Sequence, residues 1–181
     1  ISRTIAPWGI DSHRKKASLL FMDGPAPSPL NDSERTTIEA HAGADRIALI
    51  ASSFHRVTGQ PLLPDGGPLW SAPMVILAHG TQDDPIFFYA NRMALTLFET
   101  CAGDVVRMPS RYSAEAMERA ERARFLDAVG TRNFIADYAG IRISQRGRRF
   151  RIERAVVWNL LDGAGAIHGQ AACFDRWTVL D

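Results

Sequence analysis

The part of the chain from residue 74 onward constrains the fold most, because strand-like segments stand on both sides of a helical segment. Two short apolar segments, at 74–78 and 86–90, are followed by a helix from Asn91 and by a charged helix over about 114–129. Three long alternating segments then close the chain, at 134–144, 148–160 and 166–177. We therefore predict an α+β domain: a five-stranded antiparallel sheet with helices on one face and an N-terminal helical extension.

The composition is that of an ordinary globular domain. The chain has 181 residues, of which 46% are hydrophobic and 23% are charged, and this is enough for one domain with a core. Its net charge of +1 does not attract it to nucleic acid or to a membrane surface, and no apolar run is long enough to span a bilayer. Cys101 and Cys173 are expected to pack as reduced thiols, so we expect a cytoplasmic protein.

The N-terminal third divides into an arm and the beginning of the domain. Residues 1–33 are predicted to form a flexible arm because they contain a run rich in proline and glycine. Trp8 in this arm can dock on the domain or on a partner. The domain is expected over residues 34–181. It begins with a helical segment that Gly43 interrupts, so two shorter helices are the alternative to a single one.

Charged residues interrupt two predicted strand faces. Arg154 shares a face with Phe150 and Trp158, and Asp137 interrupts a face of isoleucines on the preceding strand. A buried guanidinium needs a carboxylate or an anionic ligand. Arg154 and Asp137 are therefore expected either to pair with one another across the sheet or to contact a ligand.

Tyr138 and Arg142 share the opposite face of the same strand, with Gly140 between them. The missing side chain at Gly140 leaves room for another group to approach the backbone. That group is either a ligand or a closely packed helix.

His79 follows a buried strand and precedes a turn that contains Asp84. An imidazole beside carboxylates can act as a base or as a metal ligand, and the other interpretation is a histidine that caps the turn. The five histidines of the chain show no metal-binding spacing, so no metal site is predicted.

Four further residues are candidates for ligand binding or for a structural role. Arg111 lies before a helix, where its charge is unfavourable unless it binds an anion or a carboxylate. Trp158 and Gln170 lie on adjacent long strands, and Trp158 is expected in the core with its ring N–H paired. Asn91 is expected to cap the helix that it opens.

Two patterns argue against other classes of function. The hairpin over 142–154 holds six arginines, but they are divided between both strand faces with few aromatic residues among them, which disfavours nucleic-acid binding. The glycines over 163–169 lack the spacing of a dinucleotide-binding loop, and strands flank them on both sides.

Several blocks, in the right order, resemble the MEKHLA domain family, a PAS-related family, in its stand-alone bacterial form. The blocks are Leu77-Ala-His-Gly-Thr, Asp84-Pro-Ile-Phe-Phe-Tyr-Ala-Asn-Arg-Met-Ala-Leu, Pro109-Ser-Arg-Tyr-Ser-Ala-Glu, Asp137-Tyr-Ala-Gly-Ile-Arg-Ile-Ser and Val157-Trp-Asn-Leu-Leu-Asp. The resemblance covers about residues 45–178 and implies a PAS-like fold with a sensing or ligand-binding role. The PAS analogy also admits haem or flavin as a cofactor, although the sequence has no motif for either.

The expected function is a small-molecule-binding PAS-like sensor that signals through a homodimer or a protein partner. The predicted ligand-binding residues are His79, Arg111, Tyr138, Arg142, Arg154, Trp158 and Gln170. The alternative is a small enzyme in which His79 or Asp84 is the acid–base group and an arginine anchors the substrate. A third interpretation is a protein-interaction module that uses the arm and the first helix.

Overall fold

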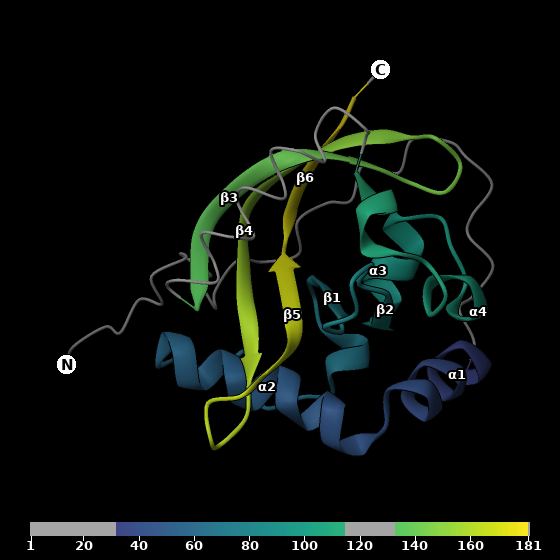
Figure 1. The fold of residues 1–181 in the computed structure, drawn as a ribbon. Helices are drawn as coiled ribbons and strands as arrows, with labels where there is room; N and C mark the ends of the chain where they lie inside the picture. Colours follow the sequence, from purple (N-terminus) through teal and green to yellow (C-terminus); the bar gives the residue numbers. More distant parts are fainter. Residues whose placement is uncertain (1–31, 115–132, 181) are drawn as a thin grey trace.

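A computed structural model of the protein describes residues 32–114 and 133–180 (Figure 1). Almost all of the expected arm, Trp8 included, and of the charged helix expected over 114–129 lies outside these residues. The elements follow one another in this order: α1 (Asp32–Ala42), α2 (Ala44–Thr58), η1 (Leu69–Ser71), β1 (Val75–His79), β2 (Phe87–Ala90), α3 (Arg92–Leu97), α4 (Ala102–Val105), η2 (Ser110–Ser113), β3 (Phe134–Ile143), β4 (Arg149–Leu161), β5 (Ile167–Phe174) and β6 (Arg176–Leu180).

The helical start of the domain is two helices rather than one. Gly43 separates α1 from α2 with φ +77°, a conformation that glycine adopts without a steric penalty. α2 ends at Gly59, whose backbone N–H donates to the carbonyl of His55 at 2.8 Å in the left-handed conformation usual for a helix stop. Among the described helices, none is long and apolar enough to cross a membrane.

The sheet is antiparallel, with strand order β2-β1-β5-β4-β3, and β6 pairs with β4 outside this path. The strand expected over 166–177 is divided into β5 and β6 at Asp175. β5 pairs with the second half of β4, and β6 pairs with the first half. The predicted strand order along the chain is therefore confirmed, and the described sheet has one more strand than the five expected.

Asn91 fastens the first strands to the following helix, as expected of a cap. Its side-chain oxygen accepts the N–H of Ala94 at 3.0 Å and the N–H of Ile76 at 3.1 Å. Its amide nitrogen donates to the carbonyl of Met74 at 2.7 Å. Because Asn91 is fully buried, these bonds supply the partners that its amide needs away from water.

One bulge on β4 and another on β3 change which residues of these strands face which side of the sheet. Gly140 pairs with Ile152, and Tyr138 pairs with Ala155, so two residues of β4 lie opposite one residue of β3. The extra residue is Arg154, with φ +54°, and Asp137 forms a second bulge on β3 with φ +60°. An inserted residue moves every later side chain to the other face.

The expectation that Phe150, Arg154 and Trp158 share one face is therefore wrong. Phe150 packs edge-on against Phe98, which follows α3, with ring centroids 5.2 Å apart. Trp158 packs on the other side against Phe54 of α2, with ring centroids 4.9 Å apart. The sequence shows a regular alternation, but the backbone at Arg154 breaks it.

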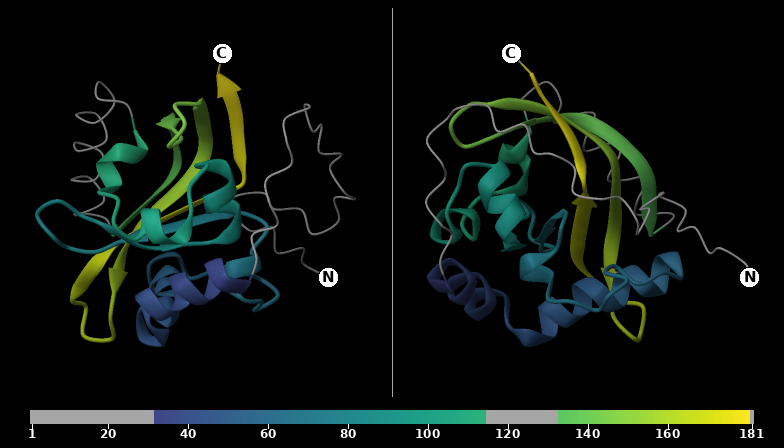
Figure 2. Two further views of the ribbon diagram at one scale, coloured as in Figure 1. Left: turned by 90° about the vertical axis from the view of Figure 1, so that its right-hand side faces the viewer. Right: turned by 180° about the vertical axis from the view of Figure 1, so that it is seen from behind.

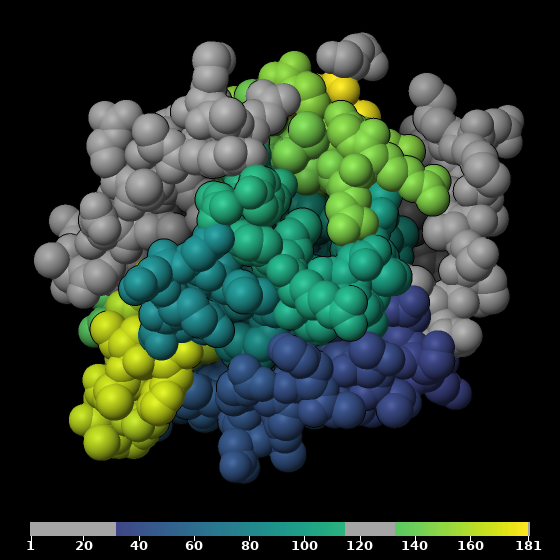
Figure 3. Space-filling view, turned by 45° about the vertical axis from the view of Figure 1, so that its right-hand side comes forward, coloured from purple at the N-terminus to yellow at the C-terminus, as the bar shows by residue number. Residues whose placement is uncertain are grey.

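Helices lie on both sides of the sheet, so the expectation of helices on one face is wrong. α1 and α2 run together along one side of the domain, far from the tip of the β3–β4 hairpin (Figures 1 and 2). α3 and η2 lie on the other side, and α4 lies beside α1, where the N–H of Ala102 donates to the carboxylate of Glu34 at 2.5 Å. The hairpin tip reaches over this helical segment (Figure 3), where the N–H of Gln145 donates to the carbonyl of Phe98 at 2.9 Å. The space between the hairpin and these helices holds the candidate site.

Candidate functional site

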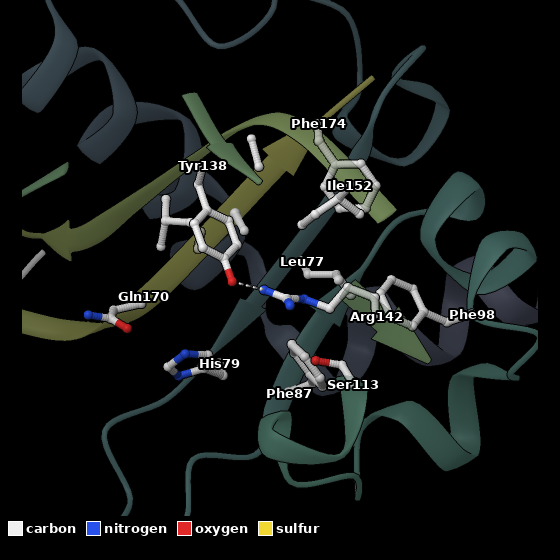
Figure 4. A pocket seen from close by; sticks show the side chains of 14 residues that line it. Leu77, His79, Phe87, Phe98, Ser113, Tyr138, Arg142, Ile152, Gln170 and Phe174 are labelled. Carbon is white, nitrogen blue, oxygen red and sulfur yellow. Dashed lines mark hydrogen bonds between the residues drawn. The ribbon is translucent and has the colours of Figure 1, made fainter. Parts of the chain in front are cut away.

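A small cavity lies between the sheet and the segment from α3 to η2 (Figure 4). It measures about 50 Å³. The sheet contributes side chains from β1, β2, β3, β4 and β5, and the cover comes from η2 and Phe98. The lining side chains with polar groups are His79, Ser113, Tyr138, Arg142 and Gln170; the others that Figure 4 labels are Leu77, Phe87, Phe98, Ile152 and Phe174.

Arg142 is the permanently charged side chain among the described residues of the lining. It is only 8% exposed. One terminal nitrogen donates to the carbonyl of Ile141 at 2.8 Å and the other to the hydroxyl of Tyr138 at 3.0 Å. The guanidinium carbon also lies 5.2 Å from the centre of the Tyr138 ring. All of these partners are electrically neutral.

The space beside Gly140 is filled by its own neighbours. A Cβ atom at this position would lie 2.5 Å from the Tyr138 hydroxyl and 3.1 Å from a terminal nitrogen of Arg142. The group that approaches the backbone is therefore this tyrosine–arginine pair, and neither the closely packed helix nor the ligand considered from the sequence. Gly140 lets both side chains lie flat on the sheet and point into the cavity (Figure 4).

His79 and Gln170 lie together, on the other side of the cavity from Phe98 (Figure 4). Nδ1 of His79 is 2.9 Å from the carbonyl oxygen of Gly80. The amide nitrogen of Gln170 donates to Asn159 at 3.1 Å, and the amide of Asn159 donates in turn to Asn133 at 3.2 Å. This chain of amides fixes the Gln170 side chain.

Gly169 makes the approach of β5 to the end of β1 possible. Its φ is +143°, and a Cβ atom there would collide with the backbone carbonyl of His79. A glycine at this point lets the two backbones touch, which places Gln170 opposite His79 in the register of the sheet.

The other predicted site residues lie elsewhere. Arg111 forms an ion pair with Asp84 and stacks on the ring of Tyr112, 4.5 Å from the ring centre, and both charged groups are well exposed. Arg111 therefore binds a carboxylate of its own chain. Of the two acid–base candidates considered from the sequence, His79 lines the cavity and Asp84 does not.

Trp158 and Arg154 lie on the α2 side of the sheet. The ring N–H of Trp158 donates to the hydroxyl of Ser53 at 3.1 Å, as expected of a paired core tryptophan. Arg154 lines a separate cavity of about 30 Å³ with Phe54 and Cys173. The ion pair between Arg154 and Asp137 is not formed between these two described residues, because both lie at bulges and the Asp137 side chain is exposed.

Ser113 and the apolar residues of the lining were not among the predicted site residues. Phe87 and Phe98 had the apolar character of core residues, and nothing distinguished them from the rest of the core. Ser113 lies in η2, whose position over the sheet depends on a bond from the N–H of Ser110 to the carbonyl of Pro85 at 2.7 Å. A long-range backbone contact of this kind leaves no signal in the sequence.

The described lining does not fit the haem or flavin that the PAS analogy admits. Pockets for ligands of drug size enclose about 300–1,000 Å³, against about 50 Å³ in this cavity. No cysteine is among the described lining residues. Cys173 lies on the opposite side, where burial raises the pKa of its thiol to about 12 and keeps it protonated. No group of three or more potential metal ligands occurs among the described residues.

Comparison with known sequences gives a family and distant plant relatives. The family model described as the MEKHLA domain matches residues 44–179. The homeobox-leucine zipper protein HOX9 of Oryza sativa subsp. indica is 26% identical over 115 residues, which cover 62% of this chain and 13% of the plant protein. HOX10 of the same subspecies is 24% identical over 176 residues, which cover 86% of this chain and 20% of the relative. The chain thus matches a minor part of these relatives.

Comparison with solved structures gives a fold. A PAS domain from Colwellia psychrerythraea superposes with a TM-score of 0.52 at 12% identity, over 61% of this chain and 89% of that one. The light-state dimer of the fungal blue-light photoreceptor Vivid gives a TM-score of 0.53 at 14% identity, over 72% of this chain and 93% of that one. The fold predicted from the sequence, a PAS-like α+β domain, is confirmed.

Proposed function

Because this chain belongs to the MEKHLA domain family, with a PAS-like fold, we propose that it is a sensor module that binds a small molecule in the cavity beneath Arg142. The observation that carries the proposal is the convergence of polar groups from three strands on one cavity. Tyr138 and Arg142 come from β3, His79 from β1 and Gln170 from β5. Small-molecule sites typically combine an apolar wall with a few polar groups that point into the same space, so this arrangement supports the proposal.

Strand β4 gives the cavity a direct route to the opposite face. Val157 lines the cavity, and its neighbour Trp158 is bonded to Ser53 and packs on Phe54 in α2. A ligand that displaces Val157 therefore also moves a residue held by α2. Because packed elements shift between discrete arrangements, a small displacement of this kind can change the position of a whole helix.

A second route leads to the β3–β4 hairpin. Phe98 lines the cavity, and the carboxylate of the next residue, Glu99, accepts the hydroxyl of Ser144 at 2.5 Å and pairs with Arg148 at 3.0 Å. Glu99 has φ +50°, so its position is held by these contacts against its backbone preference. A displacement of Phe98 by the ligand would move Glu99 and, through its bonds to Ser144 and Arg148, the hairpin.

The output of the module, in this proposal, is association with a second copy or with another protein in the cytoplasm. The structural neighbour Vivid is described as a light-state dimer. Cys101 and Cys173 are both free thiols in the structure, which supports a reducing compartment. Light scattering with and without ligand would measure the association directly.

Native mass spectrometry of the purified protein tests ligand binding. We expect a small non-covalent mass that is released on denaturation and that is absent from Ala172→Leu, in which the larger side chain fills the cavity. The matched control is Ala164→Leu, which adds the same side chain to the exposed turn between β4 and β5. If the protein carries no bound mass, and no member of a broad metabolite library changes its melting temperature, it is not a small-molecule sensor.

A further inference from the structure

We propose that the ligand is a small organic monocarboxylate, whose carboxylate is bound by the guanidinium of Arg142 beside the hydroxyl of Tyr138. This inference rests on the proposed sensing function and names the chemical class of its ligand. It depends on the charge of Arg142, on the charges around it and on the size of the cavity.

The charge argument begins with the burial of Arg142. Its side chain is more than nine-tenths buried, yet the bonds that it makes go to a carbonyl and a hydroxyl. No acidic side chain lies within ion-pair distance of it among the described residues. Removing a cation from water without a counter-charge is costly, and a charged partner recovers that cost. The structure therefore leaves a place for one negative charge.

The geometry of the guanidinium favours a carboxylate. Arginine carries five N–H donors in a planar fork, and the structure records one bond from each terminal nitrogen. The remaining donors can bind a planar carboxylate in the bidentate manner that arginine prefers. The Tyr138 hydroxyl accepts from a terminal nitrogen of Arg142, so a carboxylate bound by the guanidinium lies close to this second polar group.

The rest of the lining limits the ligand to one charge. Leu77, Phe87, Phe98, Ile152 and Val157 give the cavity an apolar wall. Arg142 is the one permanent cation among the described lining residues, so a dicarboxylate would bring a second negative charge without a counter-charge. A phosphate would leave oxygens facing apolar side chains. A monocarboxylate with a short hydrocarbon chain can pair with Arg142 through its charge and contact the apolar wall through its hydrocarbon part.

The volume limits the length of that body. A water-sized group needs about 10–15 Å³ of cavity volume, so the cavity of about 50 Å³ holds roughly three to five such groups. Acetate, propionate and butyrate fall at or near this limit. Longer acids would have to displace Phe98 or Val157.

The test is a titration series read by melting temperature and by amide chemical shifts in NMR spectra. The probes are acetate, propionate, butyrate and hexanoate, the uncharged propionamide and inorganic phosphate, with sodium chloride at matched ionic strength. We expect the short carboxylates to stabilise the protein and to shift resonances of β3 and β5, propionate to bind about tenfold or more tightly than propionamide, and hexanoate and phosphate to bind more weakly.

Variants identify the binding group. Arg142→Met keeps an apolar side chain of similar length and should abolish the preference for propionate over propionamide, whereas Tyr138→Phe should weaken propionate binding by severalfold. The control is Arg151→Gln, which removes an exposed arginine from β4 and should bind propionate as the wild type does.

Three outcomes would overturn the inference: equal binding of propionate and propionamide, equal binding of phosphate and propionate, or unchanged propionate binding by Arg142→Met. A complete lack of binding by the short acids would also overturn it. The sensing function fails separately, if no compound of any class binds and the purified protein carries no mass. A neutral ligand found by mass spectrometry would preserve the function and exclude the carboxylate.

Discussion

The two faces of the sheet differ in how they treat buried polar groups. On the α2 face, the indole of Trp158 donates to the hydroxyl of Ser53 and packs against the ring of Phe54. On the other face, Arg142 is also buried, but the hydrogen bonds that it donates go to neutral groups beside a cavity. The first arrangement adds stability, whereas the second costs stability and, in the proposed function, provides the capacity to bind a ligand. Natural binding sites show the same trade-off.

The largest loss of stability is expected when a large side chain is removed from the core on the α2 face. Trp158→Ala removes a fully buried indole and leaves Ser53 without its donor, so we expect a loss of about 3–5 kcal/mol in the free energy of unfolding. Urea denaturation measures it. The control is Trp177→Ala on the outer strand β6, whose side chain is only partly buried and which should lose much less. Equal losses of unfolding free energy in the two variants would mean that Trp158 and Trp177 are equally well packed. This would contradict the stabilising role given to the α2 face.

Two glycines sharpen the contrast between backbone and side-chain contacts. Gly169→Ala should cost about 2–4 kcal/mol, because the new methyl group meets the backbone of His79, which cannot move aside, and because φ is +143°. Gly140→Ala should cost about 1 kcal/mol or less, since the ends of two flexible side chains can yield. Thermal unfolding measures both.

The Gly140 variant should nevertheless affect the cavity. Its methyl group displaces the Tyr138 hydroxyl and Arg142, so we expect ligand binding to fall although the fold remains. Gly163→Ala, where a Cβ atom has no neighbour within 4 Å, is the control for both measurements. A Gly140→Ala protein with normal binding would show that the tyrosine–arginine pair need not lie flat on the sheet.

The cavity face should respond to loss of charge in the opposite direction from the α2 face. Arg142→Met replaces a buried cation that lacks a carboxylate by an apolar side chain, so in the absence of ligand we expect stability to stay constant or to rise by about 1 kcal/mol. Denaturation of dialysed protein measures the change. A loss above about 2 kcal/mol would show that Arg142 has a structural role, and the ligand would no longer be needed to explain its burial.

Much of the architecture could be predicted from local patterns. Asn91 between a strand and a helix predicted a cap, and the alternation over three long segments predicted the meander. Polar residues on apolar strands also indicated His79, Tyr138, Arg142 and Gln170, which the fold brings around one cavity. These signals depend on residues near one another in the sequence, and local physics determines them.

The assignment of residues to faces could not be predicted, because it depends on two bulges. A left-handed conformation is uncommon for arginine, and nothing in the sequence around Arg154 indicates it. Without the bulge, Trp158 and Arg154 were expected to share a face with Phe150 and to line the same site. The tertiary pairing of β4 with both β5 and β6 imposes the bend, and a single strand does not reveal its partners.

The smallest effect concerns the β4–β5 turn, which belongs to neither face. Asp162 accepts the backbone N–H of Ala164 at 2.8 Å and of Ala166 at 2.9 Å, and it lies 2.8 Å from Nε2 of His168. The bond with His168, followed by the backbone bonds, lowers the pKa of Asp162 to about 2. The folded turn therefore favours the carboxylate, and its contribution is complete above the ordinary aspartate pKa of about 4.

This contribution should disappear as the pH falls from about 4 towards 2, the folded pKa of Asp162. Amide exchange at Ala164 and Ala166 should then accelerate beyond the normal pH dependence, whereas Asp162→Asn should show weak protection throughout this range. Asp83→Asn, in another exposed turn, is the control and should behave as the wild type. Because solvent screens the ion pair at the surface, the change should stay local to the turn. Identical profiles for Asp162→Asn and the wild type would show that the carboxylate does not order it.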